Sequence, residues 1–241
     1  MGPTTFGLPA FTRFEASHGL ADGSLRMELM VETPYSIFDE HGGVALPSLI
    51  REGNGRVVAA HFGTYDYTAS LGITAAHQHM RHLACDFARG IMQVSLAGTD
   101  VWLSDGATNV LPVGKDRAVI HHAWRQHYDD IRHSLTNAFY QGWDLHPAQL
   151  VTRYAAVYAF FLESLDAASE RLRNFIGKAA QATLVGEVFD DAATGQGLLN
   201  FFLRALNCGA VREDEIGALT GLTLEELRSG SFVTIVKGRR N

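Results

Sequence analysis

Two acidic residues, Glu32 and Asp66, have the type and spacing that a metal-dependent reaction needs. Glu32 lies near the end of segment 25–33 and Asp66 ends segment 57–66. Both segments are apolar, β-rich and bounded by turn residues, and a stretch that can form a helix separates them. In a parallel α/β sheet or barrel, the carboxyl ends of successive strands meet at one rim, where such folds carry out their chemistry. We therefore predict that Glu32 and Asp66 bind a hard divalent cation, Mg²⁺ or Mn²⁺.

The residues beside Asp66 are candidates for holding a substrate. Gly63, Thr64 and Tyr65 precede it in the predicted rim loop, and we predict that they line the bound molecule. Asp105 follows the third predicted strand on the same rim and is a further candidate, although an Asp-Gly turn explains it without any function. Asp66 itself also suits the N-cap of the segment that follows, which is compatible with metal binding.

Two other ionisable residues on these segments have a structural interpretation. His61 lies within the second predicted strand, and we expect a hydrogen-bonded core histidine rather than a metal ligand. Glu28 has the same strand parity as Glu32, so both face the same side of the sheet. For Glu28 we expect a buried ion pair with Arg26 or with a basic residue of a helix.

The elements that position these residues alternate between strand and helix. An N-terminal helix precedes four strand–helix units, with predicted strands at 25–33, 57–66, 101–104 and 139–145 and helices at 74–97 and 118–138. Such alternation predicts parallel strands with right-handed crossovers. A complete (β/α)₈ barrel takes about 250 residues. We therefore predict an α/β fold with half of a TIM barrel, about four strand–helix units, in residues 1–150 and an all-helical C-terminal extension in residues 151–241.

Composition narrows the class of protein. The chain has 241 residues, 46% of them hydrophobic, and a net charge of −6, which does not favour nucleic-acid binding. Its two cysteines, Cys85 and Cys208, indicate reduced thiols rather than a disulfide scaffold or a zinc motif. No signal peptide is visible, and the longest apolar run, 154–162, is too short to span a bilayer. We expect a cytoplasmic protein without a membrane partner.

Three motifs occur along the chain in a fixed order. They are Val31-Glu32-Thr33, then Gly63-Thr64-Tyr65-Asp66 with Leu71-Gly72, and finally Leu145-His146-Pro147-Ala148-Gln149. They resemble the fifth, sixth and eighth strand motifs of the HpcH/HpaI aldolase and citrate lyase β-subunit family, a phosphoenolpyruvate-binding type of TIM barrel. Segments 61–68, 103–109 and 141–147 further resemble an aldolase-like branch of that family. The resemblance covers residues 6–210.

The resemblance implies roles for several residues. It implies that Glu32 and Asp66 are Mg²⁺ ligands, and that the backbone after Asp66 approaches a 2-oxo acid or carboxylate held on the metal. It also implies that His146 and Gln149 support the rim structurally. The family's first four strands, with an arginine that grips the substrate, have no counterpart in this sequence.

These observations favour one function over three alternatives. The preferred function is a Mg²⁺-dependent carbon–carbon lyase that acts on a 2-oxo acid or related carboxylate through a metal-stabilised enolate. No residue is assigned to proton transfer. The first alternative is a truncated, non-catalytic fragment that needs a partner or a missing N-terminal half, so the sequence leaves open whether the chain alone is an enzyme. The others are malate synthase-like condensation and phosphoryl transfer, and the absence of a phosphate-cradling glycine loop disfavours the latter.

A half-barrel has consequences for assembly. It leaves two open sheet edges and an uncovered inner face, which folded proteins avoid. Met30, Val58, Ala60 and Phe62 lie along the strands, and whichever of them face inward would meet water. We therefore expect a homo-oligomer, or a chain that is marginally stable on its own.

Overall fold

A computed structural model describes residues 7–185 and 192–239. The chain divides into two compact units, Met1–Arg153 and Tyr154–Asn241. The division into a barrel domain and a helical domain after residue 150 stays a prediction. Among the helices of the described residues, none combines the length and the hydropathy of a membrane span.

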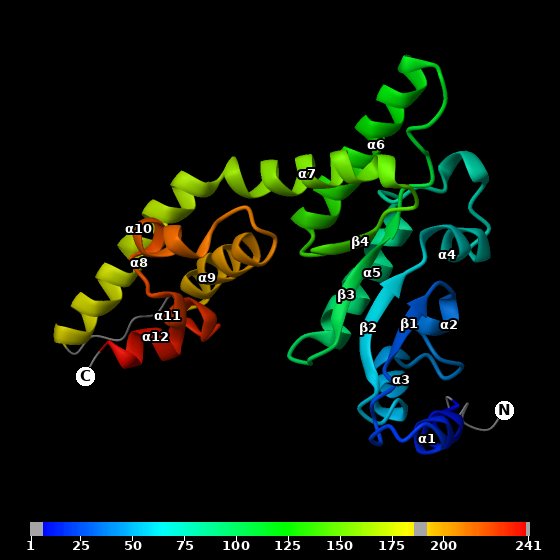
Figure 1. Cartoon of the computed structure of the whole chain (residues 1–241), viewed down its shortest axis with the longest axis horizontal. Helices are drawn as coiled ribbons and strands as arrows, with labels where there is room; N and C mark the ends of the chain where they lie inside the picture. Colours follow the sequence, from blue (N-terminus) through cyan, green and yellow to red (C-terminus); the bar gives the residue numbers. More distant parts are fainter. Residues whose placement is uncertain (1–6, 186–191, 240–241) are drawn as a thin grey trace. The chain divides into compact units, whose positions relative to one another are not determined.

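The first unit is built on a sheet of four parallel strands that lie side by side in sequence order (Figure 1). The strands are β1 (Met27–Val31), β2 (Val57–Phe62), β3 (Trp102–Ala107) and β4 (Gln141–Trp143). In the parallel register, Met30 pairs with His61 and Val31 with Phe62. Helices precede and connect the strands: α1 (Leu8–Ser17), α2 (Pro34–Ile37), α3 (Leu46–Glu52), α4 (Thr64–Ser70), α5 (Leu83–Leu96) and α6 (Arg117–Thr136). The predicted α/β class with four parallel strand–helix units is confirmed.

The main differences from the sequence-based elements lie at strand and helix ends. β2 ends at Phe62, because Gly63 is the N-cap of α4 and residues 64–66 already belong to that helix. β3 continues to Ala107, so that Asp105 and Gly106 lie inside a strand instead of forming a turn. The helix predicted over 74–97 consists of a short 3₁₀ turn (Ala75–His77) and α5, whose start is fixed by the imidazole of His82 accepting the Ala84 N–H.

One face of the sheet packs on the helices and forms the core of this unit. Leu29 and Val31 of β1 and Phe62 of β2 pack in one cluster with buried residues of α5, among them Cys85 and Met92. Side chains alternate along a strand, so Met30 and His61 point to the opposite face. There Met30, Trp102 and Trp143 are 38%, 43% and 42% exposed. The inner face that the half-barrel prediction leaves uncovered is therefore present, with Met30 on it, whereas Ala60 and Phe62 lie in the helix-covered core.

The described residues of the second unit form helices and no strand, as predicted for the C-terminal extension. α7 (Leu150–Leu162) contains the boundary between the units, and α8 (Leu165–Val185) and α9 (Ala192–Asn207) follow it. Three short helices end the described chain, α10 (Ile216–Thr220), α11 (Leu224–Arg228) and α12 (Phe232–Gly238). A capping box forms at α11, where Thr223 accepts the Glu226 N–H and Glu226 accepts the Thr223 N–H. Leu172, Leu199 and Phe202 are among the fully buried residues of this unit.

Candidate functional site

Glu32 lies directly after β1, where it covers the backbone of the neighbouring strand end. Gly63 follows β2, and its N–H donates to the carbonyl of Val31 at 3.0 Å. A Cβ atom at position 63 would lie 2.5 Å from Glu32 Cβ and 2.9 Å from its Oε2. Only glycine therefore lets the Glu32 carboxylate lie over this strand end, so Gly63 positions the acidic side chain.

Asp66 lies in the first turn of α4 rather than at the end of a strand. The helix begins at Thr64, immediately after Gly63, so Asp66 is in the first helical turn and is exposed. An acidic side chain is favourable at this end of a helix because the helix dipole is positive there. Since β1 and β2 are parallel neighbours, Glu32 and the start of α4 lie at the same carboxyl rim of the sheet.

Both carboxylates are without partners in the described residues. Neither Glu32 nor Asp66 accepts a hydrogen bond or forms an ion pair within residues 7–185 and 192–239. Their oxygens are the hard ligands that Mg²⁺ prefers, and they are not committed to the fold. Within the same residues, no group of three or more His, Cys, Asp or Glu side chains is arranged to hold a metal ion.

Thr64 and Tyr65 have side chains that are already engaged. The Thr64 hydroxyl is buried and donates to Met80 Sδ at 3.1 Å. The Tyr65 hydroxyl accepts the Asn109 N–H at 3.0 Å, and burial raises the pKa of Tyr65 to about 12. These contacts hold the start of α4 against the loop that follows β3. The roles of Gly63, Thr64 and Tyr65 in substrate binding stay predictions. The N–H groups of Thr64 and Tyr65 lie in the first turn of α4, where a helix offers them no acceptor of its own.

Asp105 is the centre of a buried network below the rim. It is 1% exposed, and Arg89 of α5 donates to its two oxygens at 3.0 and 3.2 Å. Ser134 of α6 donates to Oδ2 at 2.6 Å, and the Gly106 N–H donates to Oδ1 at 2.8 Å. Asp105 thus fastens two helices to β3. Its predicted contact with substrate remains a prediction.

His61 is held by hydrogen bonds on both of its ring nitrogens, as expected for a structural histidine. The indole N–H of Trp143 donates to Nδ1 at 2.9 Å, and Nε2 lies 2.5 Å from Glu28 Oε2. Because an indole nitrogen can only donate, Nδ1 is the acceptor and the ring proton is on Nε2, facing Glu28. The predicted partner Arg26 is wrong, because Arg26 donates to the Gly55 carbonyl, and Glu28 is half-exposed rather than buried.

Two further clusters at the rim were not predicted. His127 Nε2 and Arg153 bind the carboxylate of Asp144, just past β4. Burial alone would raise the pKa of Asp144, but these hydrogen bonds lower it to about 2. Asp130 of α6 accepts the Thr108 hydroxyl at 2.8 Å and lies 3.2 Å from Arg81 Nε. A lone acidic residue on a helix or after a short strand gives no sequence signal of such a distant partner.

The expected support of the rim by residues 146–149 is confirmed. Gln149 accepts the N–H groups of Leu145 and His146 and donates to the carbonyl of Thr108 at 3.0 Å. The imidazole of His146 accepts the Ala148 N–H and so caps the short 3₁₀ turn Pro147–Gln149. Both side chains therefore fix the loop after β4.

One of the solved structures that match this chain shares its fold. The chain resembles a crystal structure of a citrate lyase from Burkholderia xenovorans LB400, with a TM-score of 0.57 and 16% identity over 88% of this chain and 62% of that chain. Haloferax volcanii malate synthase also matches, as a lead(II) complex (TM-score 0.46, 17% identity, 97% of this chain and 64% of that chain) and in a native form at 3 mM glyoxylate (TM-score 0.43, 17% identity, 89% and 60%). The chain spans less than two thirds of each of these proteins.

At such low identity the citrate lyase likeness shows the fold alone, a citrate lyase-like α/β barrel of which this chain forms a part. A comparison with curated proteins finds no match. The family model for the domain of unknown function DUF6986 matches residues 8–235, and the chain therefore belongs to that family.

Proposed function

We propose that this chain carries the cation site of a Mg²⁺- or Mn²⁺-dependent carbon–carbon lyase of the aldolase and citrate lyase type, acting on a 2-oxo acid or related carboxylate. One observation carries the proposal. Glu32 and Asp66, at the carboxyl rim of neighbouring strands, have no partner among the described residues, whereas Asp105, Asp144 and the half-exposed Glu28 are all paired. Two uncompensated carboxylates at one rim attract a divalent cation.

The donor set fits a hard cation. Mg²⁺ dehydrates reluctantly and is commonly bound by one or two carboxylates together with water and substrate oxygens. Glu32 and Asp66 supply two such carboxylates, and no third side chain is needed. When bound, the cation supplies a Lewis acid that polarises substrate oxygens and stabilises the negative charge that develops as the carbon–carbon bond breaks.

The surrounding residues position the two ligands and the substrate. Gly63 leaves the space that the Glu32 side chain occupies, and Asp66 lies in the first turn of α4. The engaged side chains of Thr64 and Tyr65 hold this segment in one conformation, so a substrate at the rim would contact its backbone. The Arg89–Asp105 pair anchors α5 below it. Rigid support of this kind is what holds catalytic groups in a productive geometry.

The exposed inner face of the sheet supports a proposal about assembly. Met30, Trp102 and Trp143 give this face an apolar and aromatic surface. Among the residues that the structure describes, β1 and β4 are the outer strands of the sheet, and each pairs with one neighbour only. Exposed apolar faces and open edges mark sites of association. We propose that the active form is a homo-oligomer in which further strands cover this face; a chain without such cover would be the non-catalytic alternative.

The two free cysteines support a cytoplasmic location, which is part of the same proposal. Cys85 is buried and Cys208 half-buried, and neither forms a disulfide. Unpaired thiols of this kind are typical of a reducing compartment.

Calorimetry of the whole chain tests the proposed activity at its first step. Mg²⁺ is titrated with pyruvate or oxaloacetate present, and saturable binding is expected. Glu32→Gln and Asp66→Asn should each lower the affinity for the cation by about tenfold or more, equivalent to about 1.4 kcal/mol. Glu52→Gln and Asp100→Asn are the controls, since these exposed carboxylates precede β2 and β3 at the other end of the strands. Absent binding, or equal binding by all five proteins, would refute the proposal.

A further inference from the structure

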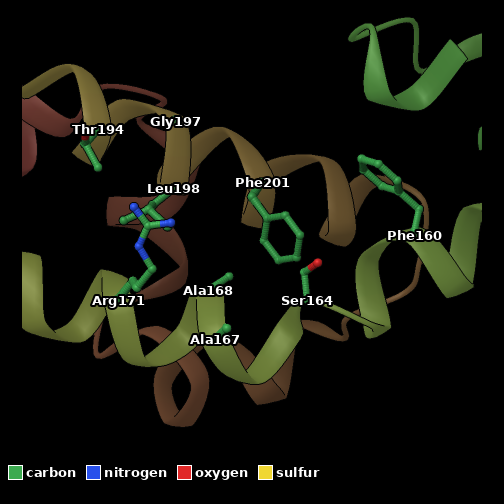
Figure 2. Close-up of a pocket in the computed structure, with 9 residues that line it drawn as sticks. All are labelled: Phe160, Ser164, Ala167, Ala168, Arg171, Thr194, Gly197, Leu198 and Phe201. Carbon is green, nitrogen blue, oxygen red and sulfur yellow. The ribbon is translucent and has the colours of Figure 1, made fainter. Parts of the chain in front are cut away.

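The second unit contains a groove between α8 and α9 that the proposed lyase site does not use. Its volume is about 520 Å³, which falls within the range of about 300–1,000 Å³ found for small-molecule pockets. Figure 2 shows the lining residues, which come from the end of α7, from positions 164–171 at and just before the start of α8, and from positions 194–201 of α9. They are Phe160, Ser164, Ala167, Ala168, Arg171, Thr194, Gly197, Leu198 and Phe201.

The groove exists because small residues stand where two helices face each other. The lining positions on α9 are 194, 197, 198 and 201, and those on and before α8 are 164, 167, 168 and 171. Both sets follow the i, i+3, i+4, i+7 spacing of a single helix face. Ala167, Ala168 and Gly197 leave unfilled space between the faces, and Leu198 and Phe201 provide apolar walls (Figure 2).

Two glycines of α9 differ in what surrounds them: one is packed against a neighbouring side chain, and the other borders the groove. A Cβ atom at Gly195 would lie 2.5 Å from the ring of Phe232, so packing requires that glycine. A Cβ atom at Gly197 would meet nothing within 4 Å. Glycine inside a helix is destabilising relative to alanine, and at position 197 no neighbouring atom requires it. Because position 197 carries no side chain, the groove stays open there.

Arg171 places a positive charge at one end of this groove. Its guanidinium points across the groove toward α9, beside Leu198 (Figure 2). It is exposed and makes no ion pair or hydrogen bond with the described residues. By contrast, Arg173, two positions later, donates to the carbonyls of Ala218 and Leu219. The planar guanidinium of Arg171 is thus free for a carboxylate, which it matches in geometry.

The other end of the groove is aromatic and carries one hydroxyl. Phe201 projects its ring into the groove near Ser164, and Phe160 lies beyond them (Figure 2). Ser164 precedes Arg171 by seven residues, and at 1.5 Å per residue the two lie about 10 Å apart along the helix. A ligand that reaches from the cation to the aromatic end therefore needs an apolar body of about that length.

We propose that this groove binds a small organic monoanion, whose carboxylate pairs with Arg171 and whose apolar body lies over Leu198 and Phe201. A single arginine among the lining residues suits one carboxylate better than a multiply charged phosphate. The site is separate from the proposed cation site and stands whether or not that site is functional.

The test uses the whole chain and sodium octanoate, whose carboxylate and chain match the cation and the apolar length. Calorimetry should show saturable binding, and the amide resonance of Gly197 should shift with the same affinity. Arg171→Gln should lower the affinity for octanoate about tenfold, or about 1.4 kcal/mol, and leave the affinity for octan-1-ol unchanged. Lys178→Gln removes one exposed positive charge from α8 outside the groove and should change neither.

A variant that fills the groove tests the proposal without changing Arg171. Gly197→Leu places a side chain in the groove where no atom obstructs it, so the fold and the Tm should be kept or improved while octanoate binding is lost. No saturable binding of octanoate by the wild type, equal binding by Gly197→Leu, or an equal effect of Arg171→Gln and Lys178→Gln would each overturn the proposal.

Discussion

The carboxylates of the first unit fall into two groups that differ in their partners. Below the rim and beside it, Asp105 and Asp144 are tied by arginine, histidine and hydroxyl groups. At the rim, Glu32 and Asp66 accept nothing from the described residues. A buried carboxylate needs partners to compensate for lost hydration, and the first group has them. The second group has no such partners, and our proposal is that it binds a ligand while the first group stabilises the fold.

The largest expected effect concerns the paired group. Arg89→Met leaves Asp105 buried with only Ser134 and a backbone N–H as donors. Removing one partner of a buried ion pair costs about 3–5 kcal/mol. Urea unfolding should show a loss of this size, while Asp66→Asn, at an exposed carboxylate without partners, should change stability by no more than about 0.5 kcal/mol. Equal stability losses in the two variants would erase the distinction between the groups.

The second prediction concerns acid stability. The pKa of Asp144 is lowered to about 2, below the ordinary value of about 3.9 for Asp. A depressed folded pKa gives stability that is fully present above the unfolded pKa and is lost as the pH falls through the folded pKa. Asp144 therefore contributes about 2 kcal/mol near neutral pH, which disappears between about pH 4 and pH 2.

The variant Asp144→Asn measures this contribution. The difference in unfolding free energy between it and the wild type should be constant above about pH 5 and should vanish near pH 2. A difference that persists unchanged at pH 2 would show that the carboxylate charge is not what His127 and Arg153 recognise.

The third prediction concerns Gly63, which lies against the side chain of Glu32. Gly63→Ala brings a Cβ atom within 2.5 Å of Glu32 Cβ, so the Glu32 side chain must move. Cation affinity should fall by about tenfold, equivalent to about 1.4 kcal/mol. Gly90→Ala in α5 is the matched control, because a Cβ there meets nothing within 4 Å. Cation titration of both variants should show a loss only for Gly63→Ala; unchanged affinity in it would mean that Glu32 does not bind the cation.

The smallest effect is expected at His61. Trp143→Phe removes the indole N–H from Nδ1 and keeps an aromatic ring on the inner face of the sheet. A lost hydrogen bond of this kind costs about 1 kcal/mol. Thermal unfolding should detect it as a small fall in Tm with cation affinity unchanged. A loss of cation affinity instead would place His61 and Glu28 in the functional group of residues.

The sequence predicted the alternation of elements well because each strand and helix carries its own periodic pattern. β1 and β2 were found from their apolar runs, which turn residues bound on both sides. Strand ends were less predictable: nothing local shows that Gly63 already caps a helix, or that Asp105-Gly106, a typical turn pair, continues a strand. Asp105 stays in β3 because Arg89 and Ser134, 16 and 29 residues away, supply its partners.

In the candidate site, too, local features were predictable from the sequence and contacts between distant residues were not. Glu32 and Asp66 were predicted from residue type and order, which are local properties, and the parallel pairing of β1 and β2 puts Glu32 and the start of α4 at one rim. Their role in cation binding stays a prediction. The partners of Glu28 and Asp144 were missed because His61 and His127 come close only in the folded chain. One usable signal was overlooked: Arg89 stands on the apolar face of α5 among Cys85, Ala88 and Met92, where an arginine requires a buried partner.

We propose that Glu32 and Asp66 together hold one divalent cation. Titration of the whole chain with Mn²⁺, followed by the loss of the free-ion signal in electron paramagnetic resonance, tests this binding. We expect one Mn²⁺ bound per chain, with weaker binding in both Glu32→Gln and Asp66→Asn and displacement by excess Mg²⁺. Undiminished binding in the two variants, or no saturable binding by the wild type, would contradict it.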